Sequence, residues 1–127
     1  MPRGSVDAGF VDELKTDKDC VVDRSWIEDY VALILWACGR FNVKVMSIAM
    51  CLSRRKGLHF YIRIQPAVPS VIANRIQWLI GDDCGRVDFN RARIEVGFKE
   101  WNKLFEEIGT KPRIIYRDRS LRRRSDA

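Results

Sequence analysis

The chain has 127 residues, of which 46% are hydrophobic and 10% aromatic, enough apolar side chain to build one domain and too much for a disordered polypeptide. No apolar run approaches the roughly 20 residues of a membrane-spanning helix, and the first residues lack the apolar stretch of a secretory signal. We therefore expect a cytoplasmic protein that contacts no membrane. Most of the net charge of +6 lies at one end, because residues 111–127 carry seven basic and two acidic side chains, a net +5.

The first predicted element follows an N-terminal arm. Residues 1–24 show no sustained periodicity, and we expect them to be mostly irregular. Ser25 and Glu28 have the spacing of a capping box, which predicts that a helix begins there. Gly39 is a typical residue at a helix C-terminus. The apolar residues between them recur at helical spacing: Ile27, Tyr30, Val31, Ile34 and Cys38.

A hairpin of two strands is predicted next. Residues 43–52 are largely apolar in both alternating sets, as in a strand that is buried on both faces. Residues 58–65 predict a second strand with two different faces, Phe60, Ile62 and Ile64 on one and His59, Tyr61, Arg63 and Gln65 on the other. Arg54-Arg55-Lys56-Gly57 between the strands predicts a basic turn.

The second half of the chain predicts two helices separated by a strand. Residues 71–80 have helical periodicity after Ser70, which can cap the helix. Residues 86–96 are expected to form a strand, with a bulge near Asn90 where the alternation changes phase. Residues 98–108 present apolar side chains at helical spacing and predict the last helix.

The predicted order is therefore α-β-β-α-β-α. It indicates an α+β fold, a two-layer sandwich with a mainly antiparallel sheet of three to four strands and two or three helices, as in ferredoxin-like or RRM-like proteins. We expect a single domain over residues 25–116, preceded by the irregular arm and followed by an Arg-rich tail over residues 117–127.

The cysteine and histidine content argues against a zinc site. The four cysteines form no C-x-x-C pair and there is one histidine, so we expect no metal ion and no cofactor. Cys38 and Cys51 lie in apolar runs and should be small core residues. The carboxylates that a metal could recruit are Asp82, Asp83 and Asp88, although the first two also fit an ordinary turn after a helix.

Residues 53–59, Ser-Arg-Arg-Lys-Gly-Leu-His, resemble the second motif of archaeo-eukaryotic primases and primase-polymerases, S-x-x-[KR]-G-x-H. The resemblance implies that Ser53, Lys56, Gly57 and His59 contact nucleotide phosphates. The first motif of that family, D-x-D on a strand, has no counterpart in the predicted strand over residues 43–52. The resemblance therefore implies a catalytically silent relative, with Asp88 as the one stand-in for a later carboxylate of the family.

A second resemblance covers residues 53–93. Uncharacterised proteins of phages, archaeal viruses and plasmids often combine a G-K-G-x-H-like turn with an L-x-G-D-D segment, and Leu79-Ile80-Gly81-Asp82-Asp83 is similar to that segment. The resemblance implies an origin in a mobile element.

These features favour a nucleic-acid-binding or replication-associated protein, for DNA or RNA, over an enzyme. Arginine can bind a phosphate through two hydrogen bonds, and aromatic residues on a sheet face can stack on bases. The residues expected to contact nucleic acid are Ser53, Arg54, Arg55, Lys56, His59, Tyr61, Arg63, Arg117, Arg119, Arg122, Arg123 and Arg124. Two alternatives remain open: a nucleic-acid enzyme, either a degenerate primase or a metal-dependent nuclease, and a protein that self-associates as a homo-oligomer through Trp26 and Trp36.

Overall fold

The computed structural model describes residues 9–18, 24–52, 57–102, 104 and 110–119. This part of the chain forms four strands and three helices. In chain order the elements are β1 (Phe10–Lys18), α1 (Arg24–Arg40), β2 (Lys44–Leu52), β3 (Leu58–Pro69), α2 (Ser70–Leu79), α3 (Cys84–Glu95) and β4 (Arg113–Arg117).

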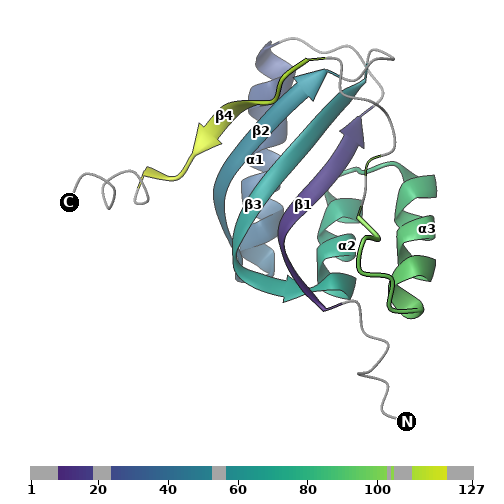
Figure 1. The fold of residues 1–127 in the computed structure, drawn as a ribbon. Coiled ribbons are helices and arrows are strands. Elements are labelled where there is room, and N and C mark those ends of the chain that lie inside the picture. The colour runs from purple at the N-terminus through teal and green to yellow at the C-terminus, as the bar shows by residue number, and fades with distance from the viewer. Residues whose placement is uncertain (1–8, 19–23, 53–56, 103, 105–109, 120–127) are drawn as a thin grey trace.

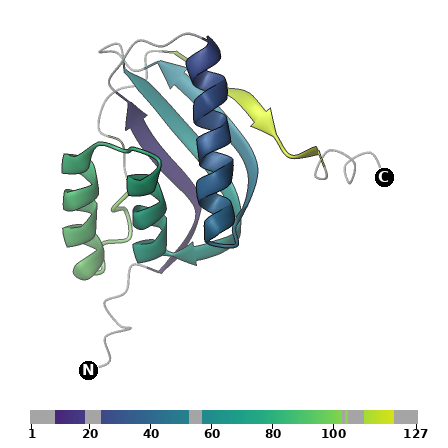
Figure 2. The same cartoon turned by 180° about the vertical axis from the view of Figure 1, so that it is seen from behind.

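The four strands form one antiparallel sheet in the order β1-β3-β2-β4. Helix α1 crosses one face of this sheet, α2 packs beside it, and α3 lies outside α2 near the edge made by β1 (Figures 1 and 2). None of the described helices covers the other face, which is turned toward the viewer in Figure 1. We call this the open face. The expected α+β sandwich with a mainly antiparallel sheet is confirmed.

The order of the elements differs from the expected one. The chain runs β-α-β-β-α-α-β, and its first five elements have the order of a ferredoxin-like unit. Strand β4 then pairs with β2, at the sheet edge opposite β1. This pairing brings the basic end of the chain onto the sheet.

The core lies between the sheet and the helices α1 and α2. Phe60, Ile62 and Ile64 of β3 are buried there, as their alternation predicts. Phe60 meets Tyr30 of α1 edge-on, with 4.7 Å between ring centroids, and Trp26 stacks on Tyr30 at 4.9 Å. The expected burial of Cys38 and Cys51 is also confirmed.

The expected irregular arm contains the edge strand β1. Leu14 and Thr16 are fully buried, and the Thr16 hydroxyl lies 3.0 Å from that of Tyr30. The residues that alternate with them, Glu13, Lys15 and Asp17, lie on the open face. Leu14 is the one buried hydrophobic residue of β1, so periodicity did not reveal the strand.

The expected strand over residues 86–96 is wrong, because residues 84–95 form α3. The buried residues Asn90 and Ile94 are four apart, the spacing of one helix face, whereas Val96, at the end of the expected strand, is 74% exposed. The described part of the expected last helix, residues 98–102 and 104, is not helical, and the rest lies outside the described residues.

Candidate nucleic-acid interface

Cross-strand pairing arranges the side chains of the open face in three rows, because residues that face each other on neighbouring strands point to the same side of a sheet. The arginine row contains Arg117, Ser47, Arg63 and Glu13. The tyrosine row contains Ile114, Ala49, Tyr61 and Lys15. The histidine row contains Cys51, His59 and Asp17.

The arginine row presents two guanidinium groups to solvent. Arg63 lies on β3 and Arg117 on β4, separated by β2, so their backbones are about 10 Å apart. The Arg63 side chain is 61% exposed and lies 3.7 Å from the equally exposed carboxylate of Asp12, a contact that solvent screens strongly. Both arginines are therefore available to an anionic ligand.

The tyrosine row places an aromatic ring between two smaller side chains. Tyr61 is half-buried between Ala49 and Lys15, and its hydroxyl is hydrogen-bonded to Cys51. Burial, and to a smaller extent Cys51 and the carboxylates of Glu13 and Asp17, raise the pKa of Tyr61 to about 12. The phenol is therefore uncharged at neutral pH and does not repel phosphates.

The histidine row contradicts the expectation that His59 is exposed. The His59 side chain is fully buried, and its Nε2 lies 3.6 Å from Oδ1 of Asp17. Its cross-strand neighbour Cys51 is buried as well. His59 therefore lies on the predicted face of β3, but its buried side chain does not reach a ligand at the surface in this conformation.

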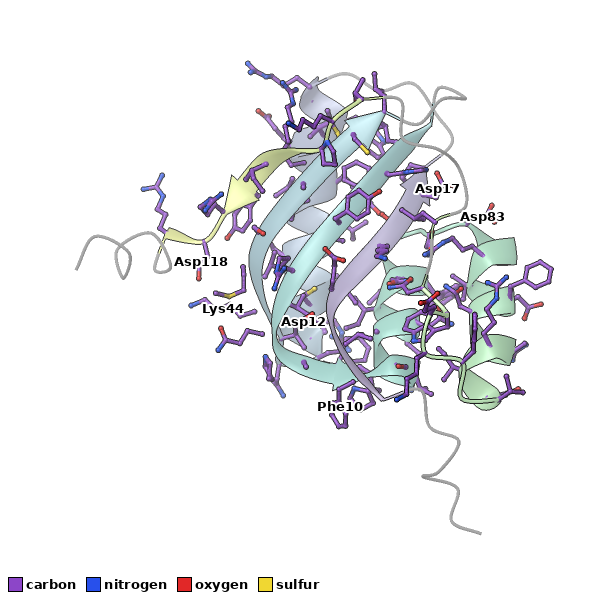
Figure 3. All side chains as sticks on the ribbon, viewed as in Figure 1. Phe10, Asp12, Asp17, Lys44, Asp83 and Asp118 are labelled. Carbon is purple, nitrogen blue, oxygen red and sulfur yellow. The ribbon has the colours of Figure 1, made fainter. Side chains whose placement is uncertain are left out.

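The β4 edge carries further exposed cations. Arg113, Arg117 and Arg119 are exposed, and a hollow of about 350 Å³ is lined by residues 114–117 and 119. Asp118 forms an ion pair with Lys44 at 3.0 Å (Figure 3). The backbone N–H of Asp118 donates to the carbonyl of Met46. The packed domain thus extends beyond residue 116, and Arg117 belongs to a strand of the sheet instead of the expected tail.

The structure unites part of the predicted site. Tyr61, Arg63 and Arg117 lie on one face, and Arg119 follows directly after β4. Sequence reasoning missed Ser47, Ile114, Lys15 and Asp17, whose placement depends on strand pairing. The remaining predicted contacts lie outside the described residues: Ser53, Arg54, Arg55, Lys56, Arg122, Arg123 and Arg124.

The three carboxylates considered as metal ligands lie in different surroundings. Asp83 caps the N-terminus of α3 by accepting from the N–H of Arg86, and Asp88 bonds to Arg91 on the exposed side of that helix. Asp82 is buried and pairs with Arg86. Within the part of the chain that the structure describes, no group of three or more His, Cys, Asp or Glu side chains could hold a metal ion.

Asp82 and Arg86 belong to a buried polar cluster that covers the outer edge of β1. Asp82 Oδ1 accepts from the N–H of Asp17 at 3.0 Å, and Arg86 Nη1 donates to the carbonyl of Lys15 at 3.1 Å. Gln77 accepts from the N–H of Lys15 at 2.9 Å. Burial raises the pKa of Asp82, which Arg86 and the backbone N–H groups counteract. Asp82 therefore helps to position β1.

Asn102 completes this cluster. Its side-chain oxygen accepts from Arg86 at 2.8 Å and from Gln77 at 3.0 Å, and its amide nitrogen donates to Gln77 at 2.8 Å. The same nitrogen lies 3.4 Å from the carbonyl of Glu13. Side chains from α2, α3 and the segment after α3 thus occupy the backbone groups of β1 that a further strand would need.

Comparisons with protein-family models, curated proteins and solved structures found no match to this chain. No helix in the described ranges combines the length and the apolar character needed to cross a membrane. The open face, with Tyr61, Arg63 and Arg117, is therefore the candidate functional surface.

Proposed function

We propose that this protein binds single-stranded nucleic acid, DNA or RNA, across the open face of its sheet and does so without catalysis. The cross-strand register carries the proposal, because it sets the ring of Tyr61 one row from Arg63 and Arg117. Successive residues on one face of a strand lie about 7 Å apart. A base stacked on Tyr61 would therefore have its phosphate within reach of the two arginines.

The energetics of such a contact suit a sequence-tolerant binder. Stacking of a base on an aromatic side chain contributes about 1–3 kcal/mol, and phosphate contacts add affinity that depends on salt. Ser47 and Ala49 lie on β2, between β3 and β4. Their small side chains leave space on the open face for a nucleic-acid chain. The resemblance of residues 53–93 to proteins of phages, archaeal viruses and plasmids supports a role in replicating such an element.

The first test measures binding of a fluorescent oligothymidylate by anisotropy over a salt series. Arg63→Ala and Arg117→Ala should each lower the slope of log K against log salt by about 0.7, because each removes one phosphate contact on a single strand. Tyr61→Ala should weaken binding about 5- to 150-fold at unchanged slope, through loss of stacking. Tyr61→Phe should bind like the unmodified protein.

Arg75→Ala is the matched control, since Arg75 is an exposed arginine on α2, on the helical side of the molecule. It lowers the net charge equally and should leave the slope unchanged. Equal effects of Arg75→Ala and Arg63→Ala would show that binding depends on the overall charge of the protein. That result would contradict a site on the open face.

A second test concerns the basic C-terminal residues. A chain ending at Arg119 keeps β4 and the Lys44–Asp118 pair but loses Arg122, Arg123 and Arg124. If these arginines contact phosphates, the salt slope should fall by about 2, which is three contacts at about 0.7 each. An unchanged slope with lower solubility would show that the segment only solubilises the protein.

A further inference from the structure

The outer side of α1 carries apolar side chains that no described element covers. Helix α1 lies across the helical face of the sheet with its outer side turned away from it (Figure 2). Its inner stripe, Tyr30, Ile34, Ala37 and Cys38, is buried. On the outer side, Trp36 is 55% exposed and Leu33, three residues before it, is 39% exposed. We call the exposed residues after the first turn, Glu28, Asp29, Ala32, Leu33, Trp36, Gly39 and Arg40, the outer stripe; Arg24 and Ser25 are exposed in the first turn, before the stripe begins.

The outer stripe is self-complementary in charge. Its N-terminal end carries Glu28 and Asp29, and its C-terminal end carries Arg40. Two such helices packed antiparallel bring the acidic end of each against the basic end of the other, whereas parallel packing would oppose like charges. A two-fold axis relates the same patch on both subunits, so one complementary pair is formed twice.

We propose that a second copy of this chain packs against the outer stripe, α1 against α1, antiparallel about a two-fold axis that crosses the interface between Ala32 and Trp36. In this register Asp29 lies beside Arg40 of the second copy, on the same flank of the helix pair, and Ala32 faces Trp36 of the second copy. A large side chain thus meets a small one, as close packing of helices requires. The proposal does not depend on nucleic-acid binding.

Two further features of the helix suit this arrangement. The Arg40 guanidinium lies over the Trp36 ring, 5.5 Å from its centroid, so the cation is already held beside the apolar centre of the stripe. At Gly39 an added Cβ would meet nothing within 4 Å, which leaves open space for a neighbouring helix beside Glu28 of the second copy. A dimer of this kind keeps both open faces on its outside.

The interface is small, so the dimer should be weak. Stable complexes bury about 1,200–2,000 Å² in total, more than one helix stripe from each partner supplies. Sedimentation equilibrium at concentrations from about 10 µM to about 1 mM covers the relevant range. The unmodified protein should shift from monomer to dimer within it, and a monomer at all concentrations would overturn the proposal.

The first variant removes the aromatic anchor. Trp36→Ala should raise the dimer dissociation constant about thirtyfold or more, as for a central tryptophan of an interface. Trp78→Ala is the matched control, because Trp78 of α2 is 59% exposed and lies off the outer stripe. Equal loss of association in both variants would point to nonspecific apolar contact and overturn the proposal.

Charge reversal tests the antiparallel register directly. Asp29→Arg alone and Arg40→Glu alone should each weaken the dimer about tenfold, since attraction becomes repulsion at both symmetric pairs. The double variant Asp29→Arg/Arg40→Glu should recover association. The two positions are eleven residues apart on one helix, roughly 16 Å, too far to interact within a monomer. Failure of the double variant to recover, with unchanged circular dichroism, would exclude this register.

Discussion

Replacing Arg86 by alanine is expected to lower the free energy of unfolding by about 3–5 kcal/mol, because it leaves Asp82 as a buried carboxylate without its cation. The side chains of Arg86 and Asp82 are 10% and 0% exposed, so water does not replace the lost partner. The substitution also removes donors to the carbonyls of Lys15 and Asn102. Urea unfolding followed by tryptophan fluorescence measures the change.

The same helix supplies the control for this prediction. Arg91 and Asp88 form an ion pair of similar length in α3, with side chains 70% and 71% exposed. Arg91→Ala should change stability by less than about 1 kcal/mol, as for surface pairs in general. In an Asp82→Asn background, Arg86→Ala should lower the free energy of unfolding by less than it does alone, because no buried charge then loses its partner. Strict additivity of the two substitutions would contradict a coupled buried pair.

Phe60→Ala is expected to cost about 3–5 kcal/mol of stability, the usual range for deleting a buried aromatic side chain. Phe60 is fully buried and touches the Trp26 and Tyr30 rings, so its loss opens a cavity between α1 and β3. Phe89→Ala, on the outside of α3, should change stability by less than about 0.5 kcal/mol. A comparable effect at both positions would mean that Phe60 does not anchor α1 to the sheet.

The part of the fold that sequence patterns predicted is the part with two clear faces. Residues 58–64 alternate between the core and the open face, and α1 and α2 repeat apolar residues at helical spacing. Such segments bury a full stripe, and hydrophobic burial is a local signal that one sequence contains. The α+β class followed from these elements alone.

Strand β1 and helix α3 were not predicted, because tertiary contacts stabilise them more than any local sequence pattern does. Helix α3 buries only Asn90 and Ile94, and Val87 and Phe89 among exposed charges imitate the alternation of a strand. The clearest local sign of α3 is Asp83, a typical N-cap residue. Asp83 also fits an ordinary turn, so it did not by itself indicate a helix. Strand β1 is held by side-chain hydrogen bonds from Gln77, Asp82 and Arg86, which no periodicity in residues 10–18 reveals.

The residues of the candidate site also fall into two groups, those that a local pattern predicts and those that long-range strand pairing places. Tyr61 and Arg63 share a strand face, so their proximity followed from the period of a strand. Arg117 joins them only because β4 pairs with β2 and sets Arg117 opposite Ser47. Pairing between distant segments is a long-range property, and the sequence therefore predicted a basic tail where the structure has an edge strand.

The two edges of the sheet have different consequences for aggregation. Side chains already satisfy the outer backbone groups of β1 from Glu13 to Asp17, so a strand from another molecule would have to displace a buried ion pair to add there. In the described part of the chain no strand pairs with the outer side of β4. A strand from another molecule can therefore add at the β4 edge but not at the β1 edge. If the β4 edges of two molecules paired, the sheet would stop growing at two copies. Antiparallel β4 strands centred on Ile115 would oppose Arg113 and Arg117, which disfavours even that contact. The fold therefore resists fibre formation at concentrations where a sheet with two open edges would polymerise.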